Sequence, residues 1–290
     1  MCKRFFVLAG VFGLITLLAS AQLTAQEYFD SGSWEFDESL SSATGQPDIE
    51  VVAAAGVAAE VTYEAAVING EDAIAAHLAD GAALRVHHGL EPNGGGAYVN
   101  DYTIVMDVLF PSVGSWMSLY NTTLCGDADV LSCGNDGDWF VNGAAGIGIS
   151  GNYGGADTEH RWHRLALVVN STTGTYTSYI DGIEVQQNTG AVSVDGRFSL
   201  FSAGGDIDWF LLFADESGNA GAPSEMGPVH LNAIQIRDAA LCGEEIALLG
   251  SLADGPLETA ALAGEACEGA PVAPGVAGIK DCLLYPSPRP

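Results

Sequence analysis

The chain has 290 residues, of which 37 are Asp or Glu and only 9 are Lys or Arg, so its formal net charge at pH 7 is −28. A protein that binds nucleic acid replaces phosphate counterions with Lys and Arg, so this charge excludes that class and disfavours anionic lipid. Because 48% of the residues are hydrophobic, we expect a folded core beneath a solubilising acidic surface rather than a disordered chain.

The N-terminus predicts export. Residues 1–21 combine two early basic residues, an apolar run from Phe5 to Leu18 and the small-residue stretch Ala19-Ser20-Ala21. The run is shorter than the roughly 20 residues of a membrane-spanning helix, and small residues are typical of a cleavage site. We interpret residues 1–21 as a secretory signal peptide and expect a secreted protein, extracellular or on the cell surface, without membrane insertion.

Short strand patterns then fill residues 27–250. The first is expected around Trp34, and the Ala-rich stretch 40–83 predicts further short strands, with a helix in part of 70–80 as the alternative. From Tyr98 onward, apolar or β-branched segments recur between Gly, Asn, Asp and Pro. The expected strands cover residues 102–110, 115–120, 139–141, 147–150, 162–170, 179–185, 198–201, 209–213 and 229–236. This rhythm predicts one all-β domain, an antiparallel sandwich.

The strongest strand signal lies between Trp162 and Val185. Leu165, Leu167 and Val169 alternate with other residues along the first strand, and a turn around Thr172-Thr173-Gly174 follows. Asp181-Gly182 predicts a second tight turn, because both positions of such a turn take positive φ. We therefore expect consecutive hairpins at the centre of a sheet.

The C-terminal part of the chain changes character. Residues 238–249 show helical periodicity that ends before Gly250. Pro, Gly and Ala then accumulate, so we interpret residues 251–290 as a linker. Its last ten residues differ from the acidic chain, which indicates a truncated or non-native tail and further domains downstream in the natural protein.

Three blocks of sequence, in order, carry a family resemblance. They are His88-Gly89 with Asn93-Gly-Gly-Gly96 and residues 98–107; residues 135–140 with 146–153; and residues 212–218 with 229–238 and 245–250. Together with the Trp162 hairpin, they resemble a bacterial laminin-G-like family of concanavalin A-like domains. The resemblance implies an antiparallel jelly-roll β-sandwich with one short C-terminal helix, and a binding module of a larger secreted or surface protein.

The cysteines predict two disulfides. Where the family's last helix usually opens with Ser or Thr, this chain has Cys242, three residues before Glu245. Loss of the hydroxyl cap costs about 1 kcal/mol of stability. A disulfide between Cys242 and Cys267 would offset this loss, because closing the loop stabilises the fold by about 3.5 kcal/mol through chain entropy. Cys125 and Cys133 flank a short acidic loop and form the second expected pair, and free thiols are the alternative in both cases.

A calcium site is the best candidate for chemistry. Residues two apart on an extended strand point the same way, so Asp136 and Asp138 can aim two carboxylates at one ion. Asp215 and Glu216 follow another strand and complete the predicted ligand set. The resemblance supports this hypothesis, since several laminin-G-like relatives hold calcium at such loop rims. Solvated acidic loops are the alternative.

Aromatic side chains suggest a sugar site. Trp116, Tyr120, Trp139, Tyr153 and Trp209 can each stack on a sugar ring or pack in the core. We take Trp139 and Tyr153 as the ligand contacts, together with His88 and Asn93 beside the glycine run. The alternative for His88 is a hydrogen bond to a carbonyl of that loop.

No catalytic motif stands out in residues 27–250. Laminarinase-type relatives of the fold carry Glu-x-Asp-x-x-Glu, and the nearest stretch, Asp48-Ile-Glu50, lacks the first Glu and the spacing. We therefore expect a non-catalytic module that binds a polysaccharide or glycan, with calcium assistance. The alternative is a protein-interaction or spacer domain without a sugar site. A catalytic domain further along a longer natural chain is compatible with both.

Overall fold

The computed structural model describes most of the predicted domain. The described residues are 32–53, 58, 60–112, 117–122, 137–142, 146–149, 152–155, 160–189, 192–200, 209–214 and 227–251. The predicted signal peptide at 1–21 lies outside them, as does the predicted linker and tail beyond residue 251.

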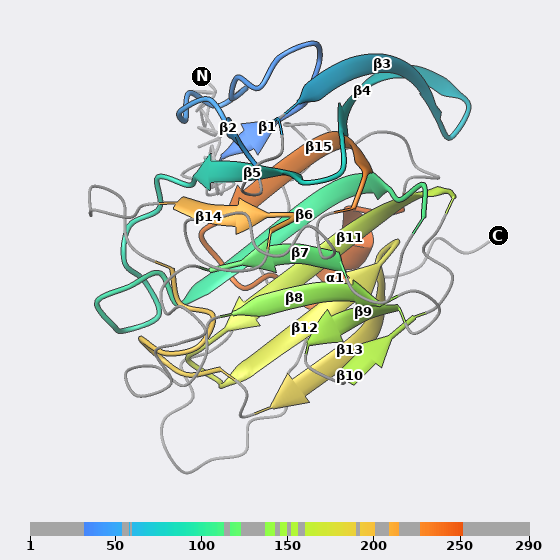
Figure 1. The fold of residues 1–290 in the computed structure, drawn as a ribbon. Helices are drawn as coiled ribbons and strands as arrows, with labels where there is room; N and C mark the ends of the chain where they lie inside the picture. Colours follow the sequence, from blue (N-terminus) through green and yellow to red (C-terminus); the bar gives the residue numbers. More distant parts are fainter. Residues whose placement is uncertain are drawn as a thin grey trace, which may run out of the picture.

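Two antiparallel sheets stack face to face (Figure 1). The eight-stranded sheet contains β1 (Ser33–Trp34), β3 (Val61–Ile68), β4 (Glu71–Leu78), β6 (Asp101–Leu109), β11 (Trp162–Asn170), β12 (Thr175–Ile180), β13 (Ile183–Thr189) and β15 (Val229–Arg237). Its order is β13-β12-β11-β6-β15-β4-β3, with β1 paired to β15.

The seven-stranded sheet contains β2 (Glu50–Ala53), β5 (Ala82–His87), β7 (Met117–Asn121), β8 (Asp138–Asn142), β9 (Gly146–Ile149), β10 (Asn152–Gly154) and β14 (Trp209–Leu212). Its order is β10-β9-β8-β7-β14-β5-β2. The one described helix is α1 (Gly243–Leu248). The predicted all-β, jelly-roll sandwich with one short C-terminal helix is therefore confirmed.

The hairpins around β11 follow the sequence prediction. β11 pairs with β6 on one side and β12 on the other. Leu165, Leu167 and Val169 are buried in the core between the sheets. Asp181 and Gly182 form the tight turn that joins β12 to β13. Such a turn requires positive φ at both positions, and their φ values are 51° and 76°.

One local prediction is confirmed over its alternative, and another needs correction. Within 70–80 the predicted strand is β4, which pairs along its whole length with β3, so the alternative helix is wrong. Asn69 and Gly70, with φ values of 53° and 84°, form the turn between them, and such an Asn-Gly pair favours a hairpin over the helix suggested by the alanines. The strand expected at 198–201 is a single bridge between Val99 and Leu200, and residue 201 lies outside the described ranges.

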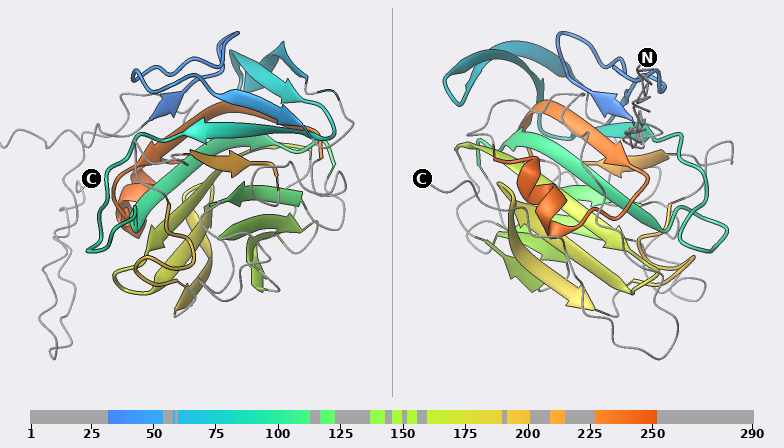
Figure 2. Two further views of the ribbon diagram at one scale, coloured as in Figure 1. Left: turned by 60° about the vertical axis from the view of Figure 1, so that its left-hand side comes forward. Right: turned by 180° about the vertical axis from the view of Figure 1, so that it is seen from behind.

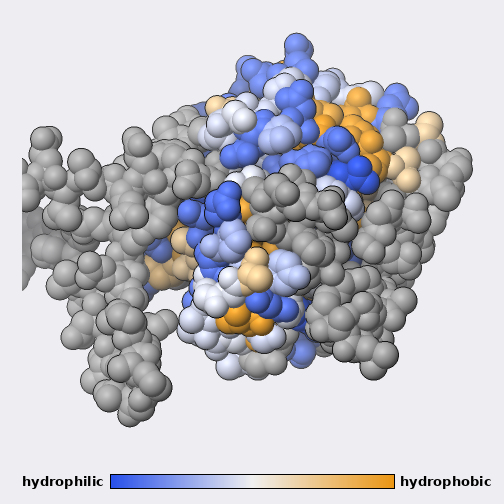
Figure 3. Space-filling view, turned by 90° about the vertical axis from the view of Figure 1, so that its left-hand side faces the viewer, coloured by the Kyte–Doolittle hydropathy of each residue, from blue (hydrophilic) through white to orange (hydrophobic). Residues whose placement is uncertain are grey.

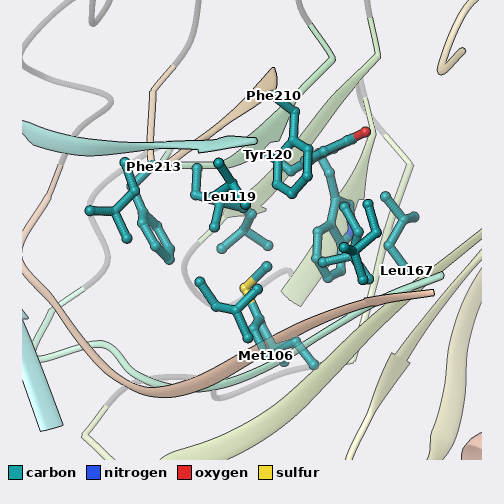
Figure 4. Close-up of a cluster of buried hydrophobic side chains, with 14 of the residues drawn as sticks. Met106, Leu119, Tyr120, Leu167, Phe210 and Phe213 are labelled. Atoms are coloured by element: carbon teal, nitrogen blue, oxygen red, sulfur yellow. The ribbon is translucent and has the colours of Figure 1, made fainter. Parts of the chain in front are cut away.

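Large apolar side chains from both sheets form the core. Figure 4 shows Met106 and Leu167 of the eight-stranded sheet together with Leu119, Tyr120 and Phe210 of the other. Polar atoms inside this core are paired across the sheets: the Tyr102 hydroxyl lies 2.7 Å from that of Tyr120. Burial raises the pKa of both tyrosines, so both stay neutral and hydrogen-bonded.

Helix α1 covers the outer face of the eight-stranded sheet (Figure 2, right). It begins at Gly243, five residues later than the start of the predicted helical stretch, and Cys242 is its N-cap. The Cys242 backbone N–H donates to Glu245 Oε2 at 2.7 Å, which is half of a capping box. Cys242 is disulfide-bonded; Cys267, Cys125 and Cys133 lie outside the described residues, so both pairings stay predictions.

No helix in the part of the chain that the structure describes is long and apolar enough to cross a membrane. On the side drawn in Figure 3, hydrophilic residues dominate the described surface, with smaller apolar areas between them.

Candidate functional site

The outer face of the seven-stranded sheet carries the candidate site. Leu84 and Val86 of β5 point into the core. Arg85 lies between these two residues and His87 follows them, so Arg85 and His87 point outward. Register places Glu50 of β2 beside Arg85, and Trp209 of β14 beside His87. We call Glu50, Arg85, His87 and Trp209 the Arg85–Trp209 patch; its three strands lie side by side in Figure 1.

Arg85 is held between a carboxylate and an indole. Its Nη1 donates to Glu50 Oε2 at 2.9 Å, and its guanidinium carbon lies 4.3 Å from the centroid of the Trp209 ring. The ring itself packs on a small apolar cluster of Ala83, Leu211 and Ala214. His87 Nε2 lies 3.8 Å from Glu50 Oε1. These contacts orient the polar groups before any ligand arrives.

The Arg85–Trp209 patch is open to solvent in part. The side chains of Arg85 and Glu50 are 26% and 54% exposed, and Trp209 is half-buried. Guanidinium N–H groups donate, carboxylate oxygens accept and an indole offers an apolar surface. Donor, acceptor and apolar ring together match a sugar, which presents hydroxyl groups around a ring with C–H faces.

Two more half-buried aromatic residues lie further along the same outer face. Phe140 of β8 pairs with Gly148 of β9, and Gly148 pairs with Tyr153 of β10. The glycine between the two rings carries no side chain, and a Cβ there would lie 2.0 Å from the Asn152 carbonyl oxygen. Aromatic surface therefore occurs at two places on this face, at Trp209 of β14 and at Phe140 and Tyr153 of β8 and β10.

Of the predicted site residues, Asp138 and Tyr153 share this face. Asp138 is almost fully buried, and its Oδ1 accepts a hydrogen bond from Asn121 Nδ2 at 2.8 Å. Asp136, Asp215 and Glu216 lie outside the described residues. Within the described ranges, no group of three or more His, Cys, Asp or Glu side chains is arranged to hold a metal ion.

Trp139 and His88 are core residues, which corrects their prediction as ligand contacts. Trp139 alternates with the outward Asp138 and Phe140, so its ring is fully buried, and Nε1 donates to Ser178 Oγ of the opposite sheet at 3.0 Å. His88 is also fully buried, and its Nδ1 accepts from the Leu90 backbone N–H at 3.0 Å. Strand alternation turns Trp139 inward, and His88, directly after the last residue of β5, is buried as well.

Asn93 holds a loop rather than a ligand, which is a further correction. Its Oδ1 accepts from the backbone N–H groups of Asn100 and Asp101, both at 2.8 Å. Its Nδ2 donates to the carbonyls of Asp101 and Asp238 at 2.7 and 3.0 Å. These four bonds use the amide's hydrogen-bonding groups within the protein.

Sequence reasoning missed Arg85 and Glu50. The available signal was an arginine within an alternating strand of a chain with only 9 basic residues. Trp209 was one of five candidate aromatics, of which Tyr120 and Trp139 are fully buried and Trp116 lies outside the described residues.

No protein-family model matches this chain, and no curated protein matches it. Among solved structures, the chain is similar to domain 4 of an extracellular arabinanase from Geobacillus stearothermophilus, solved in complex with arabinotriose. That domain is 16% identical, with a TM-score of 0.48, over 74% of this chain and 95% of the domain.

Two toxin domains are also similar. The binding domain of Paraclostridial Mosquitocidal Protein 1 is 14% identical, with a TM-score of 0.45, over 77% of this chain and 52% of that one. The botulinum neurotoxin serotype D binding domain is 12% identical, with a TM-score of 0.44, over 75% and 51%. The chain thus spans about half of each toxin domain. These likenesses are weak and carry no conclusion about what this chain binds.

Proposed function

We propose that the protein is an exported, non-catalytic module that binds a neutral carbohydrate through the Arg85–Trp209 patch. The observation that carries the proposal is the half-buried Trp209 ring with the Arg85 guanidinium 4.3 Å from its centroid and Glu50 bonded to that guanidinium. Aromatic surface binds the apolar side of the sugar, and the charged groups bind its hydroxyls.

Charge favours a neutral glycan over an acidic one. The chain has a net charge of −28, so an anionic polysaccharide is repelled at long range. Arg85 does not turn this repulsion into a local attraction, because the Glu50 carboxylate lies 2.9 Å from its guanidinium and compensates its charge. The laminin-G-like sequence blocks and the predicted signal peptide agree with a binding role outside the cell.

Binding without hydrolysis fits the chemistry of the patch. Hydrolysis of a glycosidic bond uses two carboxyl groups, about 5.5 Å apart in retaining enzymes. Among the described residues of the patch, Glu50 is the one carboxylate, and it is engaged by Arg85.

The proposal includes calcium assistance. Asp138 supplies a carboxylate on the same outer face, and Asp136, Asp215 and Glu216, outside the described residues, are the other proposed ligands. If calcium orders the loops around the sugar, EDTA weakens glycan binding and added Ca²⁺ restores it. Binding that is unchanged in EDTA removes calcium from the proposal and leaves the sugar site.

The test is an array of neutral polysaccharides probed with the full chain and with Trp209→Ala. Val67→Ser is the matched control, since Val67 is 62% exposed on a strand of the other sheet. We expect wild type and V67S to bind one glycan class and W209A to lose it. Absence of binding by the wild type favours the protein-interaction or spacer alternative.

A further inference from the structure

Two histidines form a pair on the outer face of the other sheet. His77 of β4 and His230 of β15 are direct cross-strand partners, and their rings stack with centroids 4.7 Å apart at 28°. Both are half-buried. The pair belongs to the eight-stranded sheet and is therefore separate from the Arg85–Trp209 patch, and the proposed carbohydrate binding does not use it.

Glu64 of β3 orients one of the rings. His230 Nδ1 lies 2.6 Å from Glu64 Oε1, so Nδ1 carries the proton that it donates to the carboxylate. The lone pair of the neutral ring is then on Nε2. A carboxylate or carbonyl that accepts from the non-coordinating nitrogen is the usual arrangement of a metal-binding histidine.

The ring nitrogens of His77 are available as well. Neither has a hydrogen-bond partner within the part of the chain that the structure describes. The surroundings are open to ions, because the side chains of His230 and Glu64 are 19% and 51% exposed. The net charge of −28 also raises the local concentration of cations.

We propose that His77 and His230 chelate one divalent first-row transition-metal ion, for which imidazole nitrogen is a preferred ligand. Two nitrogens on one tetrahedral ion lie about 3.3 Å apart, given metal–nitrogen distances of roughly 2.0–2.1 Å. The rings are stacked with their centroids 4.7 Å apart, so binding requires rotations about the side-chain bonds that turn one nitrogen of each ring toward the ion. Water fills the remaining coordination positions, so the ion has two protein ligands.

The test is a Cu²⁺ titration of the full chain followed by electron paramagnetic resonance. We expect one saturable ion per chain with nitrogen couplings from two imidazoles. His77→Asn and His230→Asn should each lose the two-nitrogen spectrum, and Glu64→Gln should weaken affinity by roughly 10–100-fold. His160→Asn is the matched control, because His160 is also a histidine, is exposed, and has a positive φ of 63° that asparagine tolerates.

Circular dichroism confirms that each variant is folded, and His77→Gln replaces any Asn variant that is not. The proposal is wrong if the wild type shows only oxygen ligands. It is equally wrong if folded variants at His77 and His230 keep two-nitrogen coupling at the same stoichiometry, or if His160→Asn abolishes that coupling.

Discussion

At the scale of single residues, Asp195 shows how one carboxylate holds a loop. It accepts hydrogen bonds from the backbone N–H groups of Ala97 and Tyr98, at 2.9 and 3.0 Å, and from Asn100 Nδ2 at 3.0 Å. Burial alone raises the pKa of Asp195, but the bonds from Ala97, Asn100 and Tyr98 outweigh it and hold the pKa below 3.8. The carboxylate thus joins the glycine-run loop to residues nearly a hundred positions away.

This lowered pKa predicts a pH dependence of stability. A group whose pKa is lower in the folded state contributes stability above its unfolded pKa and loses it as pH falls through the folded value. Because Asp195 is partly exposed and solvent weakens its interactions, we expect Asp195→Asn to lower the free energy of unfolding by about 1 kcal/mol or less at pH 7. Urea denaturation should show the difference shrinking as the pH falls below 3.8; a difference that persists unchanged there would contradict the assignment.

Trp139 of β8 and Trp209 of β14 should differ in how much they contribute to stability and to glycan binding. Trp139 is fully buried, so Trp139→Ala should lower the free energy of unfolding by about 3–5 kcal/mol. Trp209 is half-buried on the outer face, so Trp209→Ala should cost much less stability while it removes glycan binding. Chemical denaturation of both variants checks this; equal losses of stability would mean that Trp209 is a core residue.

At the scale of elements, a buried ion pair ties α1 to its sheet. Arg164 of β11 donates from Nε and Nη2 to the two carboxylate oxygens of Asp107 on β6, both at 2.8 Å. Its Nη1 donates to the Leu249 carbonyl just after the helix. Arg164 therefore aligns two strands and fixes the end of α1 together.

Breaking this pair should be costly. Asp107→Ala leaves the Arg164 charge buried and unpaired, so we expect the free energy of unfolding to fall by about 3–5 kcal/mol in urea denaturation. Glu50→Ala removes the carboxylate from a partly exposed ion pair with Arg85 and should cost about 1 kcal/mol or less. Similar losses in the two variants would show that the Asp107–Arg164 pair is not desolvated as the structure describes.

Element by element, the sequence predicts strands better than it predicts which way side chains point. The apolar patterns of β6, β11 and β15 are strong enough to place them within one or two residues. The ligand role predicted for Trp139 and His88 is wrong because Trp139 is followed by Phe140 and His88 is preceded by His87, so neither stretch has a clear apolar–polar alternation that indicates which side faces the core. Arg85 and Trp209 are more than 120 positions apart in the chain, and only the β5–β14 register brings them together.

At the scale of the whole molecule, the two outer faces differ. Helix α1 covers part of the eight-stranded sheet, with the His77–His230 pair beside β3 on that same face. The seven-stranded sheet carries the half-buried aromatics and the Arg85–Trp209 patch. The main core lies between the sheets, and the parts of each outer face that stay exposed can carry separate binding functions.

The most direct measurement is calorimetric titration of the full chain with the best neutral glycan from the array, for wild type, Trp209→Ala and Val67→Ser. The Arg85–Trp209 patch predicts that Trp209→Ala weakens affinity by about tenfold or more, which corresponds to about 1.4 kcal/mol, with a CD melting curve close to that of the wild type. Val67→Ser should bind as the wild type does. Equal affinity in all three proteins would contradict the central claim and place the carbohydrate elsewhere on the molecule.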